Sequence, residues 1–202
     1  AMFVGSVIAI FEVDLKRMLA YSSVAQIGYI ILGISLASVL GLTGGLLHLF
    51  NHALMKGALF LAMGCVFYRL GSVALSDLDG VGRRMPWTMA AFVIGGLSLI
   101  GIPLTAGFVS KFYLLWAALD LGFYWLVGLI LLSSLLAIIY LWRVIEVAYL
   151  REPPPGSDKV EAPLSLLLPT WALALANIYF GLDTQVSVGV AENAAKFLLG
   201  AN

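Results

Sequence analysis

Charged residues are scarce in this chain, at 11% of its 202 residues, whereas hydrophobic residues make up 62%. Soluble domains average roughly 25% charged and about 45–50% apolar residues, so this composition excludes an ordinary water-soluble protein. Basic and acidic residues balance at 11 each, and no excess of positive charge points to nucleic acid. The composition therefore predicts a protein embedded in a lipid bilayer.

Cysteine and histidine are almost absent. Cys65 has no partner cysteine, which excludes a disulfide within the chain. The histidines stand as His48-Leu-Phe-Asn-His52, but a zinc metalloprotease needs glutamate directly after the first histidine, and here Leu49 follows. We therefore expect no metal site, no cofactor and no catalytic chemistry of the chain's own, although the chain could serve as a subunit of a redox-driven translocase.

Long apolar runs are plentiful, and they predict an all-α polytopic bundle, because about 20 apolar residues suffice to cross a bilayer as a helix. The run at the N-terminus, behind Ala1-Met2, is too short for a full span, so we expect a truncated first helix or a missing N-terminal part. We also expect a turn over Gly41–Gly44. The predicted helices cover residues 2–13, 18–40, 45–68, 87–119, 121–149 and 162–182, with a polar loop over 71–86 and a proline-rich linker over 151–162.

Residues 183–202 are expected to form a tail at the membrane interface. Their central part, 185–199, is amphipathic and carries Glu192 and Lys196 four residues apart, a pattern typical of a helix lying in the interface. With strict alternation of the spans, most basic residues fall in loops on one side. That side is predicted to be cytoplasmic.

The segment 87–119 is too long for one straight span. Its 33 residues would extend about 50 Å as a helix, against a hydrocarbon core of about 30 Å. Gly101, Pro103 and Gly107 lie in its middle, and proline with flanking glycines interrupts a helix. We predict two half-helices joined by an unwound stretch, a feature often found at transport sites. The alternative is a kink that serves packing only.

Basic side chains inside the predicted spans are the candidate functional residues. His48, His52 and Lys56 follow one another at intervals of four and share one helix face. A lysine at the centre of a span costs about 2.5–3.5 kcal/mol, so Lys56 should face a cavity or a partner. Lys111 follows the predicted break directly after Ser110. The alternative is that both lysines extend to the membrane surface or pair with a neighbouring carboxylate.

Other polar residues are expected to support these cations. Ser22, Gln26 and Tyr29 form a polar stripe on their helix, suited to hydrogen bonds with a neighbouring helix or water. Arg143 and Glu146, three residues apart near a helix end, are expected to pair with each other.

Three motifs follow one another along the chain: DLKRMLAYSSVAQIGY at 14–29, HLFNHALMKGALF at 48–60 and PLTAGFVSK at 103–111. In this order they resemble the antiporter-like subunits shared by respiratory complex I and the multisubunit Mrp sodium/proton antiporters. The end of the chain, from Glu161-Ala-Pro-Leu-Ser-Leu to Asn177-Ile-Tyr-Phe-Gly, resembles most the D subunit of the Mrp antiporters.

The resemblance implies that residues 1–202 form the C-terminal part of a proton-conducting subunit in a bacterial inner membrane. Lys111 corresponds to the lysine on the family's broken twelfth helix, which serves the outward proton half-channel. His48, His52 and Lys56 correspond to the polar chain that leads to it. The implied function is proton translocation in a multisubunit cation/proton antiporter, with other membrane subunits as partners and with protons and sodium as ions. The alternatives are a proton-pumping subunit of a quinone oxidoreductase or membrane hydrogenase, and a non-transporting scaffold.

Overall fold

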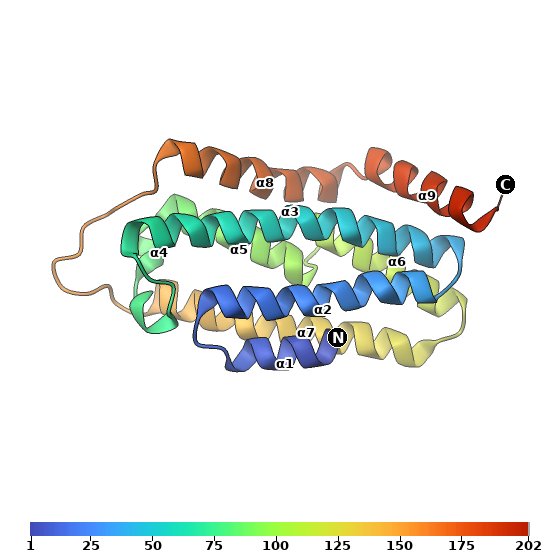
Figure 1. The fold of residues 1–202 in the computed structure, drawn as a ribbon, viewed down its shortest axis with the longest axis horizontal. Helices are drawn as coiled ribbons and strands as arrows, with labels where there is room; N and C mark the ends of the chain where they lie inside the picture. Colours follow the sequence, from blue (N-terminus) through green and yellow to red (C-terminus); the bar gives the residue numbers. More distant parts are fainter. Residues whose placement is uncertain (202) are drawn as a thin grey trace.

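The computed structural model describes residues 1–201, and its long helices run along one common axis (Figure 1). No β-strand occurs among these residues. Four segments are long and apolar enough to cross a membrane: Leu15–Ser35, Val39–Leu70, Tyr124–Leu150 and Leu164–Leu182. The prediction of an all-α membrane bundle is thereby confirmed. The helices are α1 (Met2–Phe11), α2 (Leu15–Ser35), α3 (Val39–Leu70), α4 (Val81–Arg84), α5 (Pro86–Ile100), α6 (Ala106–Asp120), α7 (Tyr124–Ile145), α8 (Leu164–Leu182) and α9 (Gln185–Leu199), with short helical turns η1 (Leu75–Asp77) and η2 (Glu146–Leu150).

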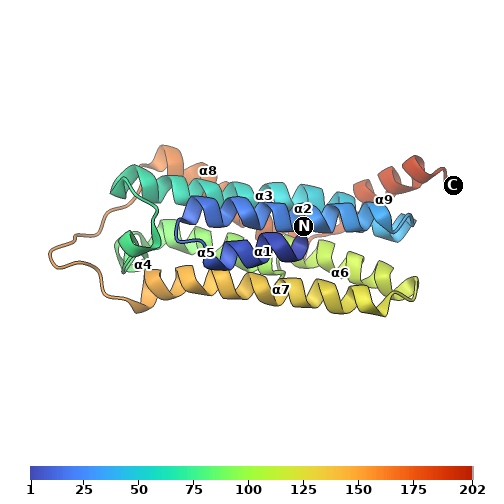
Figure 2. The same ribbon diagram turned by 60° about the horizontal axis from the view of Figure 1, so that its bottom comes forward.

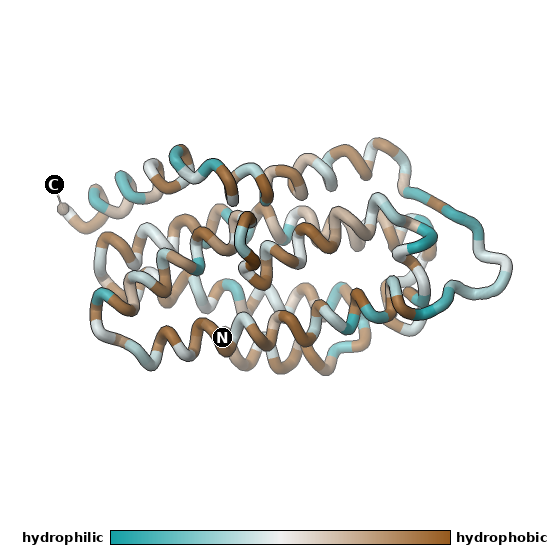
Figure 3. The backbone as a smooth tube through the Cα atoms, turned by 180° about the vertical axis from the view of Figure 1, so that it is seen from behind, coloured by the Kyte–Doolittle hydropathy of each residue, from teal (hydrophilic) through white to brown (hydrophobic). Residues whose placement is uncertain are grey.

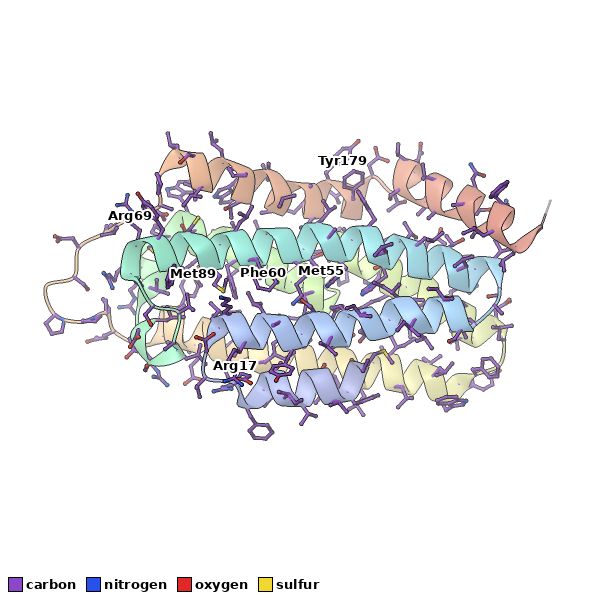
Figure 4. The ribbon with its side chains drawn as sticks, viewed as in Figure 1. Arg17, Met55, Phe60, Arg69, Met89 and Tyr179 are labelled. Atoms are coloured by element: carbon purple, nitrogen blue, oxygen red, sulfur yellow. The ribbon has the colours of Figure 1, made fainter. Side chains whose placement is uncertain are left out.

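The central element is α3, which packs against α2, α5, α6, α8 and α9. Figure 2 shows α2 and α3 side by side above α5, α6 and α7. Hydrophobic residues occur along most of the helices, as the brown stretches of the tube in Figure 3 show, and many of the large ones are exposed on the outside of the bundle. Met55 and Met89 lie between the helices in Figure 4, and both are buried. An apolar exterior over a bundle of this length is what contact with lipid requires.

Loops that carry basic residues meet at one end of the bundle, on the left in Figure 1. Backbone hydrogen bonds join them: Leu15 N–H donates to the Val73 carbonyl, and Leu75 N–H donates to the Val13 carbonyl. The linker is attached at the same end, because Val160 N–H donates to the carbonyl of Arg84. Gathering these loops at one end agrees with the alternating spans, and the assignment of this end to the cytoplasm stays a prediction.

The expected turn over Gly41–Gly44 was wrong. The turn lies earlier, and α3 begins at Val39 because the Ser38 side chain accepts a hydrogen bond from Gly41 N–H at 3.1 Å, the usual role of an N-cap serine. The glycines serve close packing instead. A Cβ on Gly33 of α2 would lie 2.6 Å from the Cα of Gly45, so the two backbones touch where side chains are absent.

The expected Arg143–Glu146 pair was also wrong. Arg143, on α7, donates to the backbone carbonyls of Ile10 and Glu12, the latter at 3.1 Å. The last carbonyls of a helix lack partners within the helix, and α1 ends at Phe11 next to α7. Arg143 therefore caps α1 rather than neutralising an acid.

Helix α9 continues from the end of α8 and packs against the first half of α3 (Figure 1). Glu192 and Lys196, four residues apart on this helix, form an ion pair at 2.6 Å. Residue 202 of the expected 183–202 tail lies outside the described residues, and the position of the tail at the membrane interface stays a prediction.

Glu161 is expected to stabilise the bundle, because it caps α5 from the linker. Its carboxylate accepts from Trp87 N–H at 2.6 Å and from the Thr88 hydroxyl at 2.8 Å, and a negative charge is favourable at a helix N-terminus. Glu161→Gln should lower stability by about 1 kcal/mol, measured by thermal unfolding of the purified protein. Glu152→Gln, on the exposed linker, is the matched control. Equal unfolding temperatures for the two variants would contradict the capping role.

Candidate functional site

The predicted helix break is present, between the end of α5 at Ile100 and the start of α6 at Ala106. Gly101 adopts a left-handed conformation with φ of 90°, which glycine allows at little cost. The N–H groups of Gly101 and Ile102 both donate to the Leu97 carbonyl at 3.0 Å, the pattern that closes a helix C-terminus. Pro103 follows within the unwound stretch and cannot continue the helix.

Gly107 brings the start of α6 against the last turn of α5. Its N–H donates to the Ser98 hydroxyl at 3.1 Å, and an added Cβ would collide with the Ser98 carbonyl. Asn51 of α3 donates to the Ala106 carbonyl at 2.6 Å. These contacts hold the ends of the two half-helices together at the break.

Lys111 lies one turn into α6 and points back at this break. Its ammonium donates to the carbonyls of Leu99 and Ile100 at 3.0 and 2.9 Å and to the Ser134 hydroxyl at 3.0 Å. Carbonyls at a helix C-terminus carry partial negative charge, so the break itself supplies the ligands of the cation. Only 4% of Lys111 is exposed, which excludes the alternative that it extends to the surface of the bundle.

Tyr29 joins the surroundings of Lys111 to those of His48. The Lys111 ammonium lies 4.8 Å from the centre of the Tyr29 ring, close enough for a cation–π interaction. The Tyr29 hydroxyl donates to the Ile130 carbonyl at 3.3 Å and lies 3.5 Å from the hydroxyl of Ser134. The ring also packs against the His48 imidazole, with centroids 5.2 Å apart.

His48 is fully buried, and both of its ring nitrogens have polar partners. Nδ1 lies 2.9 Å from the Ser110 hydroxyl and Nε2 lies 3.1 Å from the Gln26 side-chain oxygen. The imidazole therefore links α2, α3 and α6 at the level of the break. Gln26, Tyr29, His48, Ser110 and Lys111 form one group, called here the break cluster.

Lys56 lies two turns further along α3, in a second polar group. Its ammonium donates to the Leu19 carbonyl at 2.8 Å and to the hydroxyl of Ser22. Only 5% of the residue is exposed. Lys56 therefore faces α2 inside the bundle and not lipid, as predicted, and no carboxylate forms an ion pair with Lys56 or Lys111 among residues 1–201.

His52 lies between the two groups and is only partly buried. Its Nε2 atom is buried and has no hydrogen-bond partner within the described structure. His48, His52 and Lys56 all lie on α3, where they follow one another at intervals of four residues, as the predicted stripe requires. Among residues 1–201, however, no direct hydrogen bond joins the histidines to Lys56.

Several residues that hold the site together were not predicted from the sequence. Ser134 binds Lys111, Ser98 holds Gly107, and Asn51 holds Ala106. The adjacent serines 133 and 134 could have been noticed as the polar positions in an apolar span. Within residues 1–201, no group of three His, Cys, Asp or Glu side chains is arranged to hold a metal ion.

Gln26→Leu tests whether the Gln26–His48 contact matters to the bundle. The change leaves Nε2 of His48 unpaired in the interior, which costs about 1–3 kcal/mol. We expect a lower thermal unfolding temperature than for Gln185→Leu, a control on the exposed surface of α9. An unfolding temperature equal to that of the control would show that His48 does not depend on Gln26.

The comparisons agree on one family. Residues 1–137 match the family described as NADH:quinone oxidoreductase/Mrp antiporter, transmembrane. The NADH-quinone oxidoreductase subunit N of Desulforudis audaxviator is 46% identical over 209 residues, covering 96% of this chain and 42% of the relative. A chain of the Mrp complex from a Dietzia species superimposes with a TM-score of 0.90 at 29% identity, covering 99% of this chain and 47% of that one.

A chain of respiratory complex I from Thermus thermophilus gives a TM-score of 0.80 at 26% identity, covering 98% of this chain and 42% of that one. The chain thus spans a little over two fifths of the length of these relatives. The similarity extends over nearly all of its own length, including the end of α7 and all of α8 beyond the matched 1–137 segment.

Proposed function

Because this chain belongs to the NADH:quinone oxidoreductase/Mrp antiporter family of transmembrane proteins, we propose that it is part of a proton-translocating subunit of a multisubunit monovalent cation/proton antiporter. Its partners would be other membrane subunits, and its ions protons and sodium. The membrane would be the bacterial inner membrane.

The observation that carries this proposal is the pair of lysines that are buried with no carboxylate partner among residues 1–201, one of them at a helix break. An ammonium group inside a bilayer is costly unless protein groups or water surround it. Removal from water favours the neutral amine, and backbone carbonyls with a serine hydroxyl favour the ammonium instead. Because these two effects oppose each other, a lysine in this environment can bind a proton and release it again.

The proposed path uses the residues of both polar groups. Protons would pass between Lys56, His52 and His48 and reach Lys111 through Ser110 and the other residues of the break cluster. From Lys111 they would leave outward near Pro103. Imidazole suits the middle of such a path, because each ring nitrogen can accept or donate a proton near neutral pH.

A second candidate is a proton-pumping subunit of a quinone oxidoreductase, in which redox centres in other subunits supply the energy. The sequence identity is 46% to an oxidoreductase subunit N and 29% to the Mrp chain. This difference favours the second candidate. The finer expectation of a D subunit stays a prediction. A pure scaffold is disfavoured, because its lysines and histidines would have no reason to turn inward toward polar groups.

Reconstitution of the complete complex into liposomes tests the proposal and separates the candidates. Proton movement is followed with a pH-sensitive dye, first with an imposed sodium gradient and then with a reduced electron donor and a quinone. The antiporter function predicts a response to sodium, and the oxidoreductase function predicts a response to quinone reduction. Complex assembled without this subunit should give neither. Equal proton movement with and without the subunit would refute both.

A further inference from the structure

Helix α7 carries two buried hydroxyls that the path above does not use. Ser133 and Tyr140 are 2% and 0% exposed, and neither side-chain oxygen has a hydrogen-bond partner among the described residues. Ala137 lies between them on the same face, at intervals of four and three residues. Phenylalanine at position 140 would fill the same volume without a buried hydroxyl left unpaired, so packing alone does not account for Tyr140.

One end of this face reaches the surroundings of Lys56. The Tyr140 hydroxyl lies beside Ser22 of α2, and Ser22 accepts a hydrogen bond from the Lys56 ammonium. The aromatic ring of Tyr140 belongs to the main apolar core. Its hydroxyl is therefore the polar group of α7 that lies next to the ligands of Lys56.

The other end reaches Lys111. Ser133 lies beside the Tyr29 hydroxyl, which is also 3.5 Å from the hydroxyl of Ser134. Ser134 in turn accepts from the Lys111 ammonium at 3.0 Å. Both lysines thus have hydroxyl groups of the α2–α7 interface close to them, and the methyl group of Ala137 separates the two sets.

We propose that the hydroxyls of Ser22, Tyr140, Ser133, Tyr29 and Ser134 form, together with buried water beside Ala137, a second proton route between Lys56 and Lys111 that bypasses the histidines of α3. This route carries most of the flux, because among residues 1–201 no direct hydrogen bond joins Lys56 to those histidines. This inference rests on the proposed proton-translocating function. Unpaired buried hydroxyls are the groups that ordered water satisfies in protein interiors. Between the two hydroxyls this face of α7 presents only the methyl group of Ala137.

A proton moves along this route by successive transfers from one oxygen atom to the next. The Lys56 ammonium gives a proton to the oxygen of Ser22, and each hydroxyl or water passes its own proton to the next oxygen. The neutral amine of Lys111 accepts the last one. One N–H bond breaks at Lys56 and one forms at Lys111, and rotation of the hydroxyls restores the starting arrangement.

Tyr140→Phe tests the route, because it removes one hydroxyl and keeps the ring. In the reconstituted complex we expect proton flux to fall about 10²-fold, the low end of the effect of removing a proton-transfer group. The thermal unfolding temperature should stay unchanged. Tyr113→Phe, on the partly buried face of α6, is the matched control and should keep normal flux. Ser133→Ala is the second variant, used if Tyr140→Phe unfolds at lower temperature, and it should also lower flux.

Lys111→Ala is measured in the same preparation to separate this inference from the proposed function. Loss of flux in Lys111→Ala with normal flux in Tyr140→Phe or Ser133→Ala, in a stably folded complex, would overturn the hydroxyl route alone. Normal flux in Lys111→Ala would overturn the proposed function and the route with it. Loss of flux in all three variants, with the control unaffected, supports both.

Discussion

Replacing Lys111 with alanine is expected to abolish proton flux through the reconstituted complex. Lys111 is the group at which the proposed routes meet, and it is held by the carbonyls of Leu99 and Ile100 and by Ser134. Alanine has no group that can bind the proton. Loss of one proton-transfer group typically costs about 10²–10⁴-fold in rate, and no other lysine of the described part of the chain lies at the break. The measurement is the initial rate of dye-detected proton movement.

Two further variants make the result specific. Lys196→Ala removes a lysine that pairs with Glu192 on the surface of α9, and it should keep normal flux because surface pairs contribute little. Lys111→Met keeps the four-atom stem of the side chain without the amine and should be as inactive as Lys111→Ala. If Lys111→Met retained the flux of the unaltered complex, the ammonium at the break would have no role in transport.

Gly107→Ala is expected to have the largest effect on stability. The added Cβ would meet the Ser98 carbonyl oxygen and lie 2.8 Å from the Ser98 carbonyl carbon, and these are backbone atoms that cannot rotate away. The half-helices would have to separate at the break, which displaces Lys111 from its carbonyl ligands. Overpacking of this kind costs about 3 kcal/mol or more. The measurements are the thermal unfolding temperature and proton flux.

Gly189→Ala is the matched control for Gly107→Ala, because it adds the same methyl group to the interior of α9. Apart from the adjacent backbone of α9, no atom of residues 1–201 lies within 4 Å of that added Cβ, and alanine is about 0.5–1 kcal/mol better than glycine inside a helix. This control should therefore unfold at the same or a slightly higher temperature. A Gly107→Ala protein as stable as the Gly189→Ala protein would mean that the close contact of α5 and α6 is not required.

The break illustrates how far local sequence reasoning reaches. Gly101 and Pro103 predicted an interruption, because the missing N–H of proline and the freedom of glycine act over one or two turns. The same reasoning wrongly assigned a turn to Gly41 and its neighbours. Glycine also allows two helices to touch, as Gly33 and Gly45 do, and a sequence pattern alone does not distinguish the two uses.

Arg143 shows a second limit. Spacing within one helix suggested Glu146 as its partner, whereas its guanidinium binds carbonyls at the end of α1. Those carbonyls are more than a hundred positions away in the chain, and only the packing of α1 on α7 brings them together. Ser134 and Tyr140 were missed for the same reason, since their role depends on which side chains of α2 and α6 face them.

By itself the sequence determined the membrane environment, the helical class and the position of the break, and it predicted that Lys56 and Lys111 face inward, with extension to the membrane surface as the alternative. Each depends on the cost of placing charge or unpaired backbone in lipid, a cost that a residue and its near neighbours already define. Only the tertiary structure decided which groups accept hydrogen bonds from the ammonium groups of Lys56 and Lys111. Those groups lie on other helices, and hydrogen bonds act over about 3 Å, so the partners depend on how distant segments pack.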